Sequence, residues 1–79
     1  MSIDKQTIRD FLRRLINPNM KIGDDDLLIE AGLLDSLAMA QFLNFIESRY
    51  KVTFDNDDLI PENFESINAI VSFLAQKGA

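Results

Sequence analysis

The chain has 79 residues, a length that suits one domain with a small core and leaves little room for an enclosed active site. It contains no cysteine, which excludes a disulfide framework and a cysteine nucleophile, and no histidine that could serve as a general base. A net charge of −5 argues against nucleic acid and anionic membranes as partners.

The hydrophobic fraction of 47 %, with 27 % charged residues, is typical of a folded protein. We therefore expect a single domain over residues 1–79, with its core at about residues 3–76, and a monomer. No signal peptide and no apolar stretch of about 20 residues is recognisable, so no stable membrane insertion is expected. The absence of cysteine suits a reducing compartment, and we expect a cytoplasmic protein.

The first predicted helix carries apolar side chains at positions i, i+3, i+4 and i+7, with one more extending the stripe: Ile8, Phe11, Leu12, Leu15 and Ile16. Asn17 and Pro18 end this helix, because the residue before a proline avoids helical geometry. A basic stripe of Lys5, Arg9 and Arg13 follows the same helix at four-residue steps. We interpret it as a solvated face that an acidic loop balances.

A long connection over residues 17–34 follows, and connections of this length are usually functional or folded on themselves. We expect its apolar anchors to be Leu27, Leu28 and Ile29. The run Asp24–Asp26 lacks the alternating ligands and central glycine of a calcium-binding EF-hand loop. It is interpreted as a solvated acidic loop, and no metal site is predicted.

A second helix is predicted from Ser36 to about Tyr50. Its core stripe consists of Met39, Phe42, Leu43, Ile46 and Tyr50. Steps of about 100° per residue place a different set on the opposite side: Leu37, Gln41, Asn44 and Ser48, with Ala40 and Glu47 on one shoulder. Leu37 is apolar and directly follows Ser36, so a partner protein could bind to its side chain.

The remaining segment reads as a loop, a short helical turn and a final helix. Val52–Phe54 is predicted to be a loop anchor, and Pro61 to open a turn that ends at Phe64. Ser66 is the expected N-cap of the last helix, which Gly78 ends. Its apolar positions are Ile67, Ile70, Val71 and Leu74. The predicted fold is all-α: a small four-helix bundle, three helices long and one short, with a long loop between the first and second helices.

The run from Gly32 to Leu37 places a serine, preceded by an acid, where the long loop meets the second helix. Backbone N–H groups and the helix dipole at that end favour an attached phosphate group. Without a nearby base, Ser36 is predicted to be modified and not to catalyse. Six acidic residues and no Lys or Arg lie between residues 24 and 47, a charge of −6 that steers a basic partner towards this serine.

This pattern resembles the acyl carrier protein family. The resemblance rests on Asp35-Ser36-Leu37, on the loop ending Glu30-Ala31-Gly32-Leu33-Leu34, and on a phenylalanine-containing short segment before a final helix; it covers about Ile8 to Leu74. It implies a non-enzymatic carrier with a 4′-phosphopantetheine arm on Ser36, delivered from coenzyme A by a phosphopantetheinyl transferase. The arm's thiol then holds an acyl or aminoacyl group as a thioester for lipid, polyketide, nonribosomal peptide or related biosynthesis.

The resemblance also implies roles for neighbouring residues. Asp35 caps the helix and helps to position Mg²⁺ while the transferase acts. The second helix is the recognition helix of such carriers, and its matching face here is Leu37, Ala40, Gln41, Asn44, Glu47 and Ser48. The implied partners are the transferase, an acyl- or aminoacyl-activating ligase, and a downstream acyltransferase, synthase or thioesterase.

Two features separate this chain from well-known carriers. Beyond Asp35 the second helix keeps only Glu47 as an acid, whereas fatty-acid carriers have a strongly acidic second helix. Leu33-Leu34 stands where modular peptidyl carriers place a Gly-Gly pair. The motif is similar to that of discrete carriers, including aminoacyl or D-alanyl types loaded by an adenylating ligase. Phe42 and Phe45, which could crowd the interior, also favour a short acyl or aminoacyl group.

Alternatives from other classes remain open at the level of sequence. Ser36 could be only an N-cap in an unmodified helical interaction module, although Asp35 could cap equally well and leave Ser36 free. A serine hydrolase is excluded, because the chain has no histidine, no Gly-x-Ser-x-Gly motif and too few residues for an oxyanion pocket.

Overall fold

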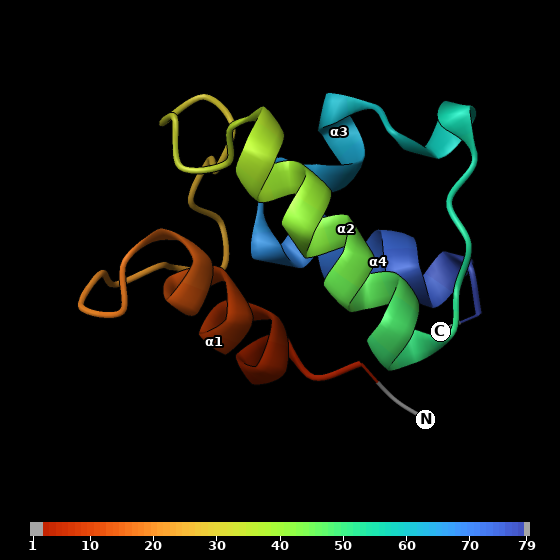
Figure 1. The fold of residues 1–79 in the computed structure, drawn as a ribbon, viewed down its shortest axis with the longest axis horizontal. Coiled ribbons are helices and arrows are strands. Elements are labelled where there is room, and N and C mark those ends of the chain that lie inside the picture. The colour runs from red at the N-terminus through yellow and green to blue at the C-terminus, as the bar shows by residue number, and fades with distance from the viewer. Residues whose placement is uncertain (1–2, 79) are drawn as a thin grey trace.

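A computed structural model describes residues 3–78. Its elements are α1 (Lys5–Ile16), α2 (Ser36–Tyr50), the 3₁₀ turn η1 (Asn56–Asp58), α3 (Pro61–Phe64) and α4 (Ile67–Gln76). Figure 1 shows α2 crossing in front of α4, with α1 below it and the long α1–α2 loop at the left. The predicted all-α bundle of three long helices and one short helix is confirmed.

The helices begin at the side chains expected to cap them. Asp35 Oδ1 accepts a hydrogen bond of 2.8 Å from the N–H of Ala38, which starts α2. Ser66 Oγ accepts one of 3.1 Å from the N–H of Ala69, which starts α4. Pro61 occupies the first turn of α3, as predicted.

The ends of the helices follow from local backbone geometry. Asn17, before Pro18, leaves helical geometry and ends α1, as predicted. Lys51 ends α2 in the left-handed region at φ 58°, and Gly78 follows α4 at φ 87°. The left-handed turn at Lys51 was not predicted, because glycine is the usual residue there and lysine carries no such signal.

The core lies where the apolar stripes of the three long helices meet. Helix α1 packs against both α2 and α4, and α3 packs against α4. The fully buried side chains are Ile8, Leu12, Leu28, Phe42, Ile46, Ile67, Ile70 and Leu74. All except Leu28 come from the helical stripes that the spacing predicted, which confirms the core faces of these helices.

The long loop is anchored at different residues from those expected. Leu28 is fully buried, but Leu27 is 45 % exposed, so its prediction as an anchor is wrong; Ile22 and Leu34 are buried instead. The N–H groups of Leu33 and Leu34 both donate to Leu28 O, at 2.8 and 3.0 Å. The loop therefore turns tightly around Leu28 and returns Leu34 to the core, while Leu27 points outward.

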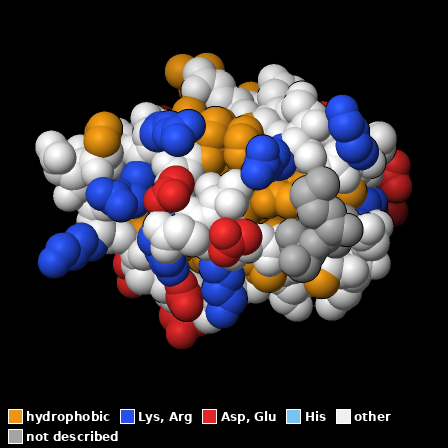
Figure 2. Space-filling view, turned by 90° about the horizontal axis from the view of Figure 1, so that it is seen from below, with side chains coloured by type: hydrophobic (Ala, Val, Ile, Leu, Met, Phe, Trp, Pro, Cys, Tyr) orange, Lys and Arg blue, Asp and Glu red, His pale blue; other side chains and the backbone are white. Residues whose placement is uncertain are grey.

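The basic stripe of α1 is balanced by the acidic loop, as predicted. Arg9 forms an ion pair with Asp24, and Lys5 Nζ lies 3.7 Å from the same carboxylate. Figure 2, which looks onto the molecule from the α1 side, shows acidic and basic side chains interspersed. Arg9 Nε also donates to Ile22 O at 2.9 Å, so this arginine holds the loop against α1.

The other two loop aspartates also form internal hydrogen bonds. Asp25 Oδ1 accepts from the side chain of Asn68 in α4 at 2.7 Å, and Asp26 Oδ2 accepts from the N–H of Gly23 at 2.7 Å. The acidic loop is thus tied to α1, to α4 and to itself, which is more than the solvated loop that we expected. Within residues 3–78, no three carboxylates converge as ligands for a metal ion.

The segment between α2 and α3 is a loop, as predicted for Val52–Phe54, and then forms η1, which was not predicted. The rings of Phe54, Phe64 and Phe73 pack together, with centroids 5.5–6.0 Å apart.

An ion pair joins η1 to the end of α4, in which Lys77 Nζ donates to Asp58 Oδ2 at 2.6 Å. The hydrogen bond from Lys77 is the main cause that lowers the pKa of Asp58, and the same bond raises the pKa of Lys77.

We expect the ion pair between Asp58 and Lys77 to make the stability of the fold depend on pH in the acidic range. Since the pKa of Asp58 is lower in the folded state, its stabilisation is present above about pH 4 and is lost as pH falls through the folded pKa. Asp58→Asn should lower the melting temperature at pH 7, and its difference from the parent should shrink towards about pH 2. Circular dichroism melts measure this, with the exposed neighbour Asp57→Asn as the control. A difference that stays constant over this range would contradict the role of the pair.

Candidate functional site

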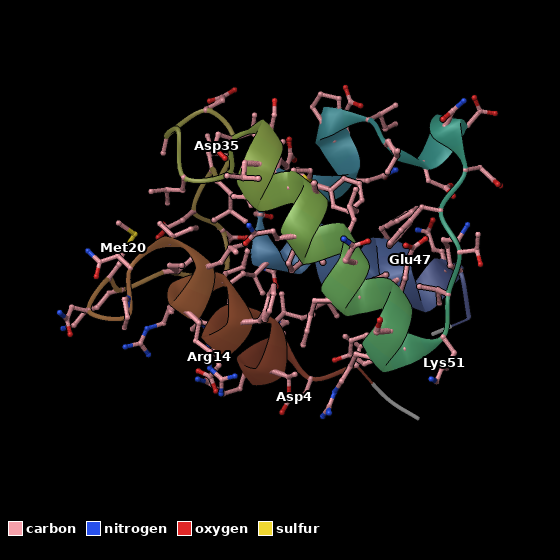
Figure 3. The ribbon with its side chains drawn as sticks, viewed as in Figure 1. Asp4, Arg14, Met20, Asp35, Glu47 and Lys51 are labelled. Carbon is pink, nitrogen blue, oxygen red and sulfur yellow. The ribbon has the colours of Figure 1, made fainter. Side chains whose placement is uncertain are left out.

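Ser36 is the first residue of α2, and its side chain is exposed. The cap of this helix is Asp35, so Ser36 is not needed as the cap. Its hydroxyl forms no hydrogen bond within the part of the chain that the structure describes. Of the two candidate caps, Asp35 is thus the N-cap of α2 (Figure 3), and the exposed Ser36 hydroxyl is not used for capping.

The backbone around Ser36 suits a phosphate diester. The N–H of Ala38 is taken by Asp35 Oδ1, and that of Met39 donates to Asp35 O at 2.8 Å. The N–H groups of Ser36 and Leu37 have no partner among residues 3–78. Two free N–H donors and the positive end of the helix dipole thus lie beside the serine oxygen, an environment that favours a bound phosphate.

The residues before the serine hold it in place. Gly32 has φ 77°, a left-handed conformation that other residues rarely adopt. This turn allows Leu33 and Leu34 to hydrogen-bond back to Leu28, and Leu34 is 4 % exposed. Ser36 is therefore exposed to solvent at the end of a loop in which Leu34, two residues earlier, is fixed in the core.

Most residues of the predicted docking surface are exposed on the outward face of α2. Leu37 is 69 % exposed, the most exposed of the large hydrophobic residues described. The exposed polar and small residues are those that the helical wheel placed there: Ala40, Gln41, Asn44 and Ser48. A partner that docks on α2 would meet Leu37 immediately beside the serine.

Glu47 has a second role that the sequence did not reveal. It is half-buried, and its Oε2 accepts a hydrogen bond of 3.3 Å from the N–H of Phe54 (Figure 3). This carboxylate therefore anchors the loop that follows α2 as well as adding charge to the edge of the face. Leu59 and Ile60, which were not predicted as surface features, are 45 % and 42 % exposed just before α3.

None of the helices between residues 3 and 78 has the length and apolar character needed to cross a membrane.

The functional groups that the structure presents are an unpaired serine hydroxyl at a helix N-terminus and a mostly uncharged helix face beside it. This arrangement can accept a phosphate-linked group and offer it to a protein partner.

Comparison with known proteins identifies the family of the chain. A family model described as "Phosphopantetheine attachment site" matches residues 5–74. The chain is also similar to the D-alanyl carrier proteins of Streptococcus suis strains 98HAH33 and 05ZYH33, with 28 % identity over 68 residues, covering 86 % of this chain and 86 % of each relative. The chain belongs to the family of phosphopantetheine-binding carrier proteins, which carry 4′-phosphopantetheine as a covalently attached group and are not themselves catalytic.

Proposed function

We propose that Ser36 is the attachment residue for 4′-phosphopantetheine and that a phosphopantetheinyl transferase loads it from coenzyme A. The observation that carries this proposal is the free, exposed Ser36 hydroxyl beside two unpaired backbone N–H groups, with Asp35 already acting as the cap. Asp35 is then placed to assist attachment. The arm supplies a terminal thiol that holds the cargo as a thioester, which fits a chain with no cysteine of its own.

The direct test is enzymatic loading of the apo protein. With coenzyme A, Mg²⁺ and a broad-specificity transferase, the intact mass should rise by one phosphopantetheine, and peptide mapping should place it on Ser36. An unmodified protein would instead support the alternative of a helical interaction module. Modification at Ser48 or Ser72 would refute the assignment of the site.

We further propose a small aminoacyl cargo of the D-alanyl type, loaded by an adenylating ligase. Its support is that the two relatives are D-alanyl carrier proteins, together with an interior filled by rings: Phe42 is fully buried, and Phe54, Phe64 and Phe73 pack against one another. Two pockets of about 230 and 190 Å³ open on α1 and are lined by charged residues, including Arg14. A long acyl chain would have to displace the rings to become buried.

The cargo proposal is tested by comparing loaded forms. A D-alanyl thioester should leave the melting temperature close to that of the unloaded carrier, because it stays in solvent. A dodecanoyl thioester should give no stabilisation either, since the core offers it no space. Stabilisation by the long chain alone would contradict a small cargo and favour a fatty-acid role. Intact mass spectrometry of protein from its native host would identify the cargo.

As a carrier, the protein would act as one cytoplasmic, monomeric domain over residues 1–79, with its core at about residues 3–76. The lack of cysteine, which suits a reducing compartment, supports that location. Its partner face would be the outward side of α2: Leu37, Ala40, Gln41, Asn44, Glu47 and Ser48. The transferase, the ligase and a downstream acyltransferase, synthase or thioesterase would share this face in turn.

We expect Leu37→Ala to lower kcat/KM for both the transferase and the ligase about tenfold, because docking then loses an apolar contact of about 1–2 kcal/mol. The matched control is Leu59→Ala, which makes the same change at a leucine that is 45 % exposed and lies outside α2. Both variants should melt close to the parent protein. Equal losses in the two variants, or a silent Leu37→Ala, would place the docking surface elsewhere.

A further inference from the structure

A surface pocket of about 230 Å³ lies between α1 and α2, and the role of carrier does not use it. Its lining residues come from one face of each helix: Thr7, Asp10, Phe11 and Arg14 of α1, and Phe45 and Arg49 of α2. On the α1 side of the molecule, Figure 2 shows apolar side chains exposed between basic ones. The pocket therefore combines an apolar surface with charged walls.

The apolar part of the pocket is a pair of stacked rings. Phe11 and Phe45 have centroids 3.8 Å apart and planes inclined by 7°. Both side chains are only half-buried, whereas Phe42, whose ring centroid lies 6.1 Å from that of Phe11, is fully buried. The stacked pair thus keeps apolar surface in contact with solvent, where an apolar group of a ligand could cover it.

The two arginines of the pocket have no partners in the described part of the chain. Arg14 and Arg49 line the pocket from opposite helices, and neither forms an ion pair or a side-chain hydrogen bond with any residue from 3 to 78 (Figure 3 shows Arg14 at the outer side of α1). Arg9 and Arg13, by contrast, donate to backbone carbonyls of the following loop at 2.9 and 2.7 Å. Two guanidinium groups therefore remain free to bind an anion.

The one acidic residue of the pocket is already engaged. Asp10 stands four residues before Arg14, a spacing that often gives an ion pair, yet its Oδ1 accepts a hydrogen bond of 2.8 Å from the side-chain amide of Gln6. The lining residues Arg14, Arg49 and Asp10 together carry a charge of +1, on a molecule whose net charge is −5. Asp10 should weaken anion binding without preventing it.

We propose that this pocket binds an acidic segment of a partner protein. A carboxylate of the segment is held between Arg14 and Arg49, and a neighbouring apolar side chain rests on Phe11 and Phe45. Charge complementarity carries the choice of a carboxylate, since the planar fork of a guanidinium group matches the geometry of a carboxylate. The stacked rings add the requirement for an adjacent apolar residue.

The distribution of charge favours a protein segment over an anionic membrane. A flat anionic surface would meet the whole molecule, whose net charge is −5. A carboxylate that enters the pocket meets the guanidinium groups on its walls, and Asp24, the acidic-loop residue that contacts α1, is already paired with Arg9 and Lys5. The concave pocket also suits a side chain better than a planar surface.

The position of the pocket leaves the arm free. Arg49 lies thirteen residues after Ser36 on the same helix, which separates them by about 20 Å along its axis. A partner could therefore hold the carrier at this pocket while another enzyme works at Ser36. Binding here should not depend on whether the arm is attached.

The experiment is an NMR titration of the ¹⁵N-labelled full chain with the peptide acetyl-Asp-Phe-Glu-Leu-amide. The neutral peptide acetyl-Asn-Phe-Gln-Leu-amide and vesicles of phosphatidylglycerol serve as comparisons. We expect saturable shifts of backbone amides in residues 7–14 and 45–49 with the acidic peptide alone. Arg14→Gln or Arg49→Gln should each weaken binding about tenfold, and Asp10→Asn should strengthen it several-fold. Lys21→Gln, the same charge change at an exposed loop position, should leave it unchanged.

Ser36→Ala should bind the acidic peptide as the parent does, which separates this proposal from that of the attachment site. Equal binding of the neutral peptide would overturn the proposal. The proposal would also be overturned if neither arginine substitution changed the affinity for the acidic peptide, or if the amide shifts lay outside the pocket. Arginine-dependent binding to the vesicles without binding to the peptide would overturn it in favour of a membrane contact.

Discussion

Ser36→Ala should abolish attachment of phosphopantetheine completely, with no mass increase after incubation with coenzyme A, Mg²⁺ and transferase. The reason is chemical, because alanine has no oxygen to form the phosphate ester. Helicity should stay close to that of the parent protein, since the cap of α2 is Asp35 Oδ1 and not the serine side chain. Intact mass spectrometry and circular dichroism on the same sample measure both results.

The matched control for this variant is Ser72→Ala. Ser72 is an exposed serine of α4, so the substitution makes the same chemical change outside the proposed partner face of α2. It should accept one arm at the rate of the parent protein. A mass increase in Ser36→Ala would show that another residue carries the arm, and loss of helicity would show that Ser36 is part of the cap.

Ile46→Ala should lower the free energy of unfolding by about 2–5 kcal/mol. Ile46 is fully buried at the centre of the apolar stripe of α2, where that helix packs on α1. Shortening it removes contacts and leaves a cavity that a densely packed core closes only in part. Because small domains have total stabilities near 5 kcal/mol, partial unfolding at room temperature is expected.

Urea denaturation followed by circular dichroism measures this loss. With a slope of about 1 kcal/mol per molar urea for a small domain, the midpoint should fall by about 2 M or more. Gln41→Ala is the control, because Gln41 is exposed on the opposite face of the same helix and should change stability by less than about 0.5 kcal/mol. Similar midpoints for Ile46→Ala and the parent protein would place the core on another face of α2.

The helices and their core faces could be predicted from the sequence because their signals are local. Apolar spacing along α1, α2 and α4 needs only the 3.6-residue period, and Pro61 and Ser66 act within one turn of their own position. The position of Ser36 at the first turn of α2 has the same origin: the periodic apolar stripe begins shortly after it. The proposed attachment site was therefore visible in the sequence as a serine at a helix start without a catalytic base.

Other features depended on contacts between segments that are distant in the chain. The sequence allowed either Asp35 or Ser36 to cap α2, and only the folded backbone shows that Asp35 Oδ1 takes the N–H of Ala38. Leu27 and Leu28 look equivalent as anchors, but the hydrogen bond of 2.8 Å from Leu28 N to Glu65 O fixes which of them faces the core. Adjacent apolar residues in a loop carry no period that separates buried from exposed.

The pocket between α1 and α2 shows the same limit. The spacing within each helix predicted which residues share a face, but the distance between Phe11 and Phe45 depends on how the two helices cross. That Arg14 and Arg49 form no ion pair with any residue from 3 to 78 likewise follows from packing. The sequence by itself thus determined the helices, their buried faces and the serine at the start of α2, because these arise within a few turns of chain. The tertiary structure decided the cap, the loop anchors and the basic pocket, because each depends on side chains that only packing brings together.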